Sequence, residues 1–208
     1  MSAASIATVT GARRTQQQRV EESTERLIQA AAELIAEGGY EAATAAEIGR
    51  RAGYSRSMVH ARFGTKEALL EAVVTSAYEG PVLVALPESA SGLERVLARL
   101  DTTAALIDES PALLRMVFAI EFQAAGSGSA MSQRVAGWLT RLRADIHAAI
   151  LDGQADNSIR ADVDAEPTAH AIVVEGIGSA FVWIVDPTED FRARITQWRQ
   201  HTLKTLTT

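Results

Sequence analysis

The sequence predicts an all-α fold of about nine helices, in which a small N-terminal helical domain precedes a larger helical region. Apolar residues recur at helical spacing along most of the 208 residues. No segment shows the strict apolar and polar alternation of a half-buried strand, and there is no internal repeat. An apolar content of 47% in a chain of this length is enough to bury a substantial core.

The composition excludes several kinds of site. The chain has no cysteine, which rules out disulfides and thiolate metal sites. Its 4 histidines are scattered and lack the spacing of metal ligands. We therefore expect no metal and no cofactor.

The first predicted helix spans residues 24–39. Its apolar residues fall on one face, its charged residues fall elsewhere, and a pair of glycines ends it. The apolar face consists of Leu27, Ile28, Ala31, Leu34 and Ile35.

Residues 44–66 have the pattern of two short helices joined by a tight turn. Thr44 and Glu47 are predicted to form a capping box, in which each side chain satisfies a backbone N–H of the other, so that a helix runs from Ala45 to about residue 52. Gly53 supplies the left-handed conformation that ends a helix, and Ser55 is expected to cap a second helix over residues 56–62.

This pair of helices is predicted to bind DNA as a helix-turn-helix. Helices joined by so short a turn must cross steeply, and Gly49 would let their backbones approach. Basic residues and no acid follow Glu47, and a helix of this size fits a major groove. The residues expected to point outward are Arg56, Ser57, Met58, His60, Ala61 and Arg62. A surface helical hairpin with merely solvated arginines is the alternative.

A further helix is expected behind Thr65, from Lys66 to the Gly80–Pro81 pair. With this helix the chain divides into four parts. These are a flexible arm at residues 1–20, a helix-turn-helix domain at 21–66, a connecting helix at 67–80 and an effector-binding and dimerisation domain at 81–208.

Residues 24–74 resemble, without gaps, the DNA-binding domain of the TetR family of bacterial transcriptional regulators. The resemblance is carried by A-x-E-L-x-x-E-x-G-Y ending at Tyr40, E-I-x-x-x-A-G-x-S from Glu47 to Ser55, and F-x-x-K-E-x-L-L from Phe63 to Leu70. It implies a homodimer that binds a pseudo-palindromic operator and releases DNA when a small molecule enters the C-terminal domain. Repression is the commoner action in the family, activation is rarer, and an architectural DNA-binding protein without a ligand is a further alternative.

The candidate DNA-binding residues are Thr44, Ser55, Arg56, Ser57, Met58, His60, Arg62 and Lys66. Two of them depart from the family, which usually has Tyr in place of His60 and a small or hydroxyl residue in place of Met58. His60 would contact a phosphate or a base, or else lie on a solvated helix face. Met58 would contact a thymine methyl group or fill the core of the hairpin.

The net charge of −6 does not exclude DNA binding, because the charge is unevenly distributed. Residues 81–208 hold 16 acidic and 11 basic residues, whereas residues 48–66 hold 5 basic residues and no acid. The arm carries Arg13, Arg14 and Arg19 and either contacts DNA or has no role there. It lacks the continuous apolar segment of a signal peptide, so we expect a cytoplasmic protein.

Residues 81–92 are expected to form a linker. Helical spacing then predicts helices over about 93–107, 111–123, 131–151, 165–185 and 189–206, with a break at 126–129 and a polar loop at 153–164. The most apolar stretch, 169–185, contains Glu175 and is shorter than the roughly 20 residues of a membrane span, which favours a buried helix and no membrane association.

The last two predicted helices are the candidate dimer interface. Their apolar stripe contains Ile172, Gly176, Ile177, Ala180, Ile184, Ile195 and Trp198. The resemblance implies pairing of these helices with a second copy as a four-helix bundle. The alternative is that both stripes face only the core of their own chain.

An effector pocket is implied by the resemblance alone. Its candidate lining residues are Met116, Phe122, Trp138 and Trp183, and ordinary core packing would explain each of them equally well. Glu121 is expected to be exposed at the surface.

No catalytic residues are predicted. Residues 53–57 lack the last glycine of a nucleophile elbow, and the Gly176–Gly178 pair lies inside a helix rather than after a strand.

Overall fold

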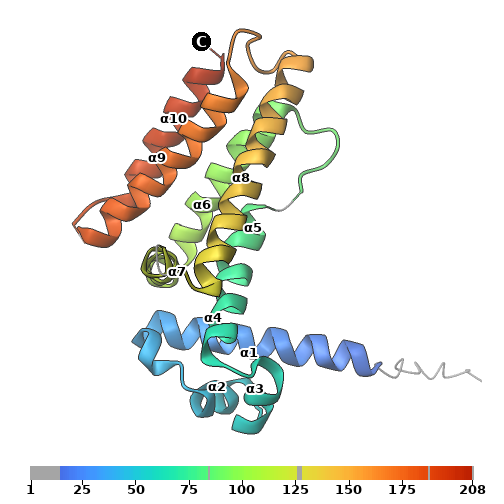
Figure 1. The fold of residues 1–208 in the computed structure, drawn as a ribbon, viewed down its shortest axis with the longest axis vertical. Coiled ribbons are helices and arrows are strands. Elements are labelled where there is room, and N and C mark those ends of the chain that lie inside the picture. The colour runs from blue at the N-terminus through green and yellow to red at the C-terminus, as the bar shows by residue number, and fades with distance from the viewer. Residues whose placement is uncertain (1–14, 84, 126–127, 187, 208) are drawn as a thin grey trace, which may run out of the picture.

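The computed structural model describes residues 15–83, 85–125, 128–186 and 188–207, and these residues form two helical domains, one above the other (Figure 1). The N-terminal domain contains α1 (Gln16–Gly38), a 3-10 turn (Tyr40–Ala42), α2 (Ala45–Ala52) and α3 (Arg56–Phe63). In Figure 1 the long helix α1 lies across this domain, with α2 and α3 beneath it.

Helix α1 begins earlier than predicted, at Gln16 rather than at residue 24. Thr15 explains the earlier start, because its side chain accepts the Gln18 N–H at 3.2 Å while the Gln18 side chain accepts the Thr15 N–H at 2.9 Å. The end of the predicted flexible arm is therefore helical. The rest of that arm, including Arg13 and Arg14, lies outside the described residues.

A continuous helix connects the two domains. It consists of α4 (Lys66–Val74), a π-helical turn η2 (Thr75–Glu79) and α5 (Gly80–Val82). The predicted stop at Gly80–Pro81 is wrong by a residue or two, since the helix continues to Val82. Proline removes a donor and crowds the carbonyl four residues before it, and the wider turn directly ahead of Pro81, with Gly80 N–H bonded to the Thr75 carbonyl, accommodates both effects.

The C-terminal domain contains five helices, whose order and approximate ranges agree with the prediction. They are α6 (Gly92–Glu109), α7 (Pro111–Ala124), α8 (Ala130–Ala155), α9 (Ala165–Val185) and α10 (Phe191–Thr207). With α4, η2 and α5 taken as one, the described residues form nine helices and no strand, so the all-α prediction is confirmed. Of the predicted break at 126–129, residues 126 and 127 lie outside the described part of the chain.

Each domain has its own apolar core. The N-terminal core is built around Leu27, Ile48, Val59 and Val73, all of them buried. The larger core is shared by helices α6 to α10 and reaches down to Val74 and Tyr78 on the connecting helix. Helix α7 contributes to both cores, so it joins the domains together with the connecting helix.

Candidate nucleic-acid interface and ligand cavity

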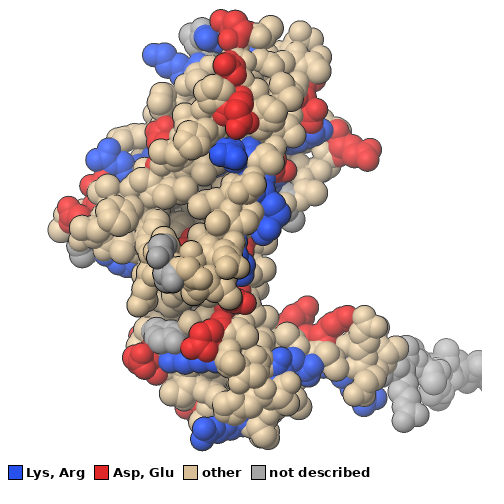
Figure 2. Space-filling model, in the orientation of Figure 1, with Lys and Arg blue, Asp and Glu red and all other residues tan. Residues whose placement is uncertain are grey.

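Helix α3 presents a polar surface at the lower end of the N-terminal domain. Ser55 caps this helix by accepting the Met58 N–H at 3.2 Å, and its hydroxyl lies 2.8 Å from that of Ser57. Arg56 and His60 are exposed one turn apart, and Arg56 Nε donates to His60 Nε2 at 3.4 Å. Basic side chains are visible at this lower end in Figure 2.

Two of the residues predicted to point outward on α3 do not. Met58 is half-buried against the N-terminal core, which supports the reading that it fills the hairpin. Arg62 is also half-buried, and its Nη2 donates to the Ser23 hydroxyl on α1 at 2.9 Å. The outward placement of Arg62 is therefore wrong. No local signal could reveal it, because the partner lies 39 residues away along the chain.

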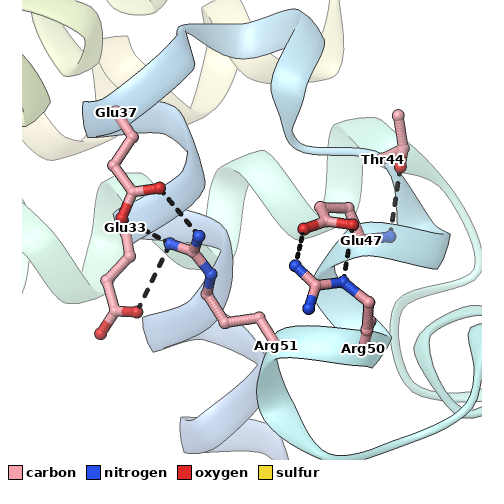
Figure 3. Close-up of polar contacts among 6 residues, drawn as sticks. All are labelled: Glu33, Glu37, Thr44, Glu47, Arg50 and Arg51. Atoms are coloured by element: carbon pink, nitrogen blue, oxygen red, sulfur yellow. Dashed lines mark hydrogen bonds and ion pairs between the residues drawn. The ribbon is translucent and has the colours of Figure 1, made fainter.

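The predicted capping box at α2 is only half formed (Figure 3). Thr44 accepts the Glu47 N–H at 3.2 Å, as expected. The Glu47 carboxylate does not return the bond, since it pairs with Arg50, while the Thr44 N–H bonds to the Ala42 carbonyl at 2.9 Å. The hydrogen bond from Arg50 lowers the pKa of Glu47, which keeps this pair charged.

Most of the basic charge of the helix-turn-helix is already paired within the domain. Arg51 forms two hydrogen bonds of 2.7 and 2.8 Å to Glu37 on α1, and these lower the pKa of that carboxyl (Figure 3). Lys66 lies 3.8 Å from Glu41. Among the described residues Arg56 and Arg62 have no acidic partner, and of these two Arg56 is the exposed one. The surface available to an anionic partner is therefore smaller than the sequence suggests.

The close contact between α2 and α3 depends on Gly49, as predicted. A methyl group at this position would lie 2.8 Å from the Tyr54 carbonyl oxygen and 3.1 Å from that of Ser55. Gly53 has a φ of 78°, the left-handed conformation expected of the residue that ends α2.

The apolar stripe predicted as a dimer interface packs within its own chain. Ile172, Ala180 and Ile195 are buried, with exposed fractions of 4%, 2% and 1%. A methyl group on Gly176 would lie 2.7 Å from the Trp198 ring, so these two residues contact each other across α9 and α10. Ile177 and Ile184 are partly buried against the same core. The structure thus favours the alternative in which this stripe faces its own core.

A different face of α9 is left uncovered. Its exposed residues recur at helical spacing, and the large ones are Val174, Phe181, Val182 and Val185, between 48% and 67% exposed. Within the described part of the chain, α9 is the one helix long and apolar enough to cross a membrane by length and composition, although core helices of soluble proteins pass the same test. Of its most apolar stretch, 28% is buried in this chain.

A small cavity of about 40 Å³ lies inside the C-terminal domain. Two predicted lining residues, Phe122 and Trp138, do line it. Met116 packs instead against the N-terminal core, and Trp183 stacks on Phe191 with ring centroids 4.6 Å apart. The other prominent side chains around the cavity, which sequence patterns did not separate from ordinary core, are Tyr78, Arg99, Thr103, Phe118, Phe191 and Trp198.

Glu121 is buried rather than exposed, with 6% of its surface accessible. Burial, with a smaller contribution from the nearby Glu79 charge, raises its pKa to about 8, while Arg134 opposes this shift. Arg134 pairs with Glu79 at 2.5 Å, which brings the connecting helix, α7 and α8 together at one polar cluster. The one signal in the sequence for this burial was the position of Glu121 among apolar residues of α7.

Solved structures with the same fold are numerous. The chain matches TylP, a TetR regulator from Streptomyces fradiae, with a TM-score of 0.68 and 20% identity over 91% of this chain and 89% of that one. It matches a TetR transcriptional regulator from Chloroflexus aurantiacus with a TM-score of 0.64 and 20% identity over 90% and 95% of the two chains. The fatty acid degradation regulator FadR from Bacillus halodurans gives a TM-score of 0.65 and 16% identity over 87% and 94%. A search of the curated proteins finds no match.

The sequence model for bacterial regulatory proteins of the tetR family matches residues 27–73. This segment covers the second half of α1, all of α2 and α3, and α4 almost to its end. The structural likeness extends the shared fold over the C-terminal helices. The N-terminal domain of the chain therefore belongs to the tetR family of bacterial regulatory proteins, whose members are DNA-binding transcription regulators and not enzymes.

Proposed function

We propose that the protein is a cytoplasmic repressor that binds a pseudo-palindromic operator as a homodimer and leaves the DNA when a small molecule occupies its C-terminal cavity. The observation that carries this proposal is the exposed surface of α3, on which Arg56, Ser57 and His60 lie together at the tip of the N-terminal domain. The homodimer and the release of DNA depend on two further features, the surface that joins two copies and the helix that connects the cavity to α3.

Arg56 is the principal candidate for a base contact. It is exposed and its guanidinium is free of acidic partners among the described residues, so it can turn from His60 toward a guanine or a phosphate. Thr44 and Lys66 lie at the first turns of α2 and α4, where they suit contacts with the DNA backbone. Ser55 is committed to its cap and is expected to contribute through that geometry. Arg62 is expected to hold α3 against α1 rather than to touch DNA.

A homodimer would form through the uncovered face of α9. One recognition helix reads few base pairs, and two-fold pairing places two of them about 34 Å apart along one side of the DNA. The exposed apolar residues of α9 supply the surface for such pairing, since a second copy would cover the same residues on both partners. This face replaces the stripe predicted from the sequence, which its own core already covers.

An effector would act through the helix that connects the domains. Tyr78 and Val82 line the cavity, and both belong to the continuous helix that begins at Lys66 beside α3. A ligand that favours a different position of this wall shifts the spacing of the two recognition helices. Only such a difference in affinity between two conformations can release DNA.

The proposal is tested first by selecting bound duplexes from fragmented DNA of the source genome. We expect a sharp inverted repeat whose half-sites lie about one helical turn apart. Arg56→Ala should weaken binding to that site by about 1–3 kcal/mol and relax the preference at one position in each half-site. Arg192→Ala, which removes an exposed arginine of α10, is the matched control and should leave affinity unchanged.

Recovery of bulk DNA without a shared motif would contradict site-specific regulation and favour an architectural protein. The direction of regulation is read from a reporter gene placed behind the recovered site. Higher expression in the absence of the protein supports repression, and lower expression shows an activator.

A further inference from the structure

We infer that the C-terminal cavity takes a small, uncharged aromatic ligand with a hydrogen-bond-accepting oxygen, which the indole N–H groups of Trp138 and Trp198 bind. This inference rests on the proposed function, because it names the chemical class of the effector for the same cavity. Four properties of the cavity carry it: its unpaired donors, its lack of free charge, its aromatic walls and its size.

Two of the side chains that line the cavity carry buried donors without partners. Trp138 is 3% exposed, and neither its Nε1 nor that of Trp198 has a hydrogen-bond partner among the described residues. A buried N–H without a partner loses the hydrogen bond that water gives it in the unfolded chain, so two such groups on the walls of one cavity favour a ligand with an acceptor that reaches them. The ligand must therefore bring accepting oxygen atoms rather than further donors.

The charge of the cavity wall is already balanced. Arg99 is the one charged residue among the lining side chains, and it donates to Asp145 at 2.9 Å and to the Val82 carbonyl at 3.0 Å. The Thr103 hydroxyl donates to the Arg99 carbonyl at 3.0 Å. Burial raises the pKa of Tyr78, so this phenol stays neutral. A charged ligand would lose its hydration without gaining a counter-charge, which favours an uncharged one.

The remaining walls are mostly aromatic. Tyr78 meets Phe118 edge-on with ring centroids 4.9 Å apart, and it lies 5.3 Å from Trp138. Flat aromatic ligands pack well between rings arranged in this way, because offset and edge-to-face contacts are favourable. The rings around the cavity are those of Tyr78, Phe118, Phe122, Trp138, Phe191 and Trp198.

The present size of the cavity explains how such a ligand would be sensed. About 40 Å³ is well below the roughly 150 Å³ of a cavity known to admit benzene, so binding must move the walls. Phe122 is a half-buried wall whose ring packs edge-on against the exposed Phe181 at 5.5 Å. Tyr78 and Val82 form the wall on the connecting helix. Opening the cavity therefore displaces either the Phe122–Phe181 pair or the connecting helix, which leads to α3.

The test measures binding of three probes of similar size to the full-length protein by equilibrium dialysis. Chromone is an uncharged bicyclic ring system with a carbonyl oxygen, naphthalene lacks the oxygen, and 2-naphthoate carries a charge. We expect chromone to bind and 2-naphthoate to bind at least about tenfold more weakly. Tighter binding of 2-naphthoate than of chromone, or no binding of chromone at millimolar concentration, would overturn the inference.

Variants then test the two donors. Trp138→Phe and Trp198→Phe keep a ring but remove the N–H, and each should weaken chromone about tenfold while changing naphthalene by less than about threefold. Retained naphthalene binding shows that the cavity is still folded. Trp183→Phe is the matched control, since Trp183 lies against Phe191 outside the cavity lining, and it should leave both probes unaffected. Unchanged chromone affinity in both cavity variants would refute the role of the indoles.

The ligand class and the proposed function can fail separately. If chromone binds with the expected dependence on the indoles but leaves the operator complex intact, the ligand class stands and the proposed release mechanism fails. If operator binding is confirmed but chromone binding does not depend on Trp138 or Trp198, the proposed DNA binding stands and the ligand class fails.

Discussion

At the scale of single residues, the angle between α2 and α3 depends on the missing side chain of Gly49. We expect Gly49→Ala to destabilise the protein by about 1–3 kcal/mol, because the added methyl group would lie 2.8 Å from the Tyr54 carbonyl oxygen. Operator affinity should fall further than stability does, since the turn that positions α3 must shift. Urea unfolding and operator binding of the same preparation measure both effects.

Gly137→Ala is the control for that substitution. It also replaces a helical glycine, but the nearest atom to the new methyl group, on the Arg141 side chain, is at 3.5 Å. Alanine loses less backbone entropy on folding than glycine, so this variant should be more stable by about 0.5–1 kcal/mol. A Gly49→Ala protein as stable as the wild type would show that the α2–α3 turn is more pliable than its close packing indicates.

A residue's role was predictable from the sequence where its partner lies within a few positions, and was not predictable where the partner lies on another helix. Thr44, Ser55 and Thr65 all act as caps, because a cap requires only a backbone N–H three residues ahead. Arg62 was misplaced because its partner Ser23 belongs to another helix. The same reason applies to the pairing of Arg51 with Glu37 on α1, which neutralises part of a surface that looks strongly basic in the sequence.

At the scale of elements, the junction of the connecting helix with α7 and α8 contains a buried carboxyl that makes stability depend on pH. The pKa of Glu121 rises from its ordinary 4.5 to about 8 through burial and the nearby Glu79 charge. The folded state then holds a proton that the unfolded state releases. This stabilisation is complete below pH 4.5, decreases as the pH rises toward about 8, and is lost above it.

We expect Glu121→Gln to weaken this dependence, because the amide keeps the shape of the protonated carboxyl and cannot ionise. Relative to the variant, the wild type should lose stability by up to roughly 1.4 kcal/mol per pH unit between pH 5.5 and 7.5. Urea unfolding at several pH values measures the difference. The control is Glu88→Gln in the exposed loop before α6, which leaves the buried cluster unchanged. Parallel stability profiles for wild type and Glu121→Gln would contradict a buried, proton-holding carboxyl.

Helical periodicity located the elements but not their neighbours. The five helices of the C-terminal domain were predicted in the right order, since capping and apolar spacing are properties of each segment. The face of α9 that remains uncovered was not predictable, because this helix is apolar on nearly all sides. Its spacing cannot show which side meets α10 and which side is left over. Trp198 illustrates the same limit, since only its contact with Gly176 shows that it belongs to the chain's own core.

At the scale of the whole molecule, the two domains place the candidate DNA surface and the uncovered face of α9 at different heights of an elongated molecule (Figure 1). The proposed ligand cavity lies in the C-terminal domain, with the connecting helix as one wall and α9 as another. A change in that wall can therefore alter the distance between two recognition helices only if two copies are joined elsewhere. Regulation by a ligand and assembly through α9 are thus parts of one proposal, and loss of the second should abolish the first.

Assembly through α9 can be tested at Phe181. Phe181→Asp places a charge on a side chain that is 52% exposed in the single chain and would be buried between two copies. We expect sedimentation at micromolar concentration to show a dimer for the wild type and a monomer for this variant, with operator affinity reduced at least about a hundredfold because the two half-sites are no longer bound together. Leu151→Asp changes an equally apolar side chain, 47% exposed on α8, and should remain dimeric. A Phe181→Asp protein that still dimerises and binds the operator tightly would place the interface on another surface, whereas a monomeric wild type that binds tightly would remove the dimer from the mechanism.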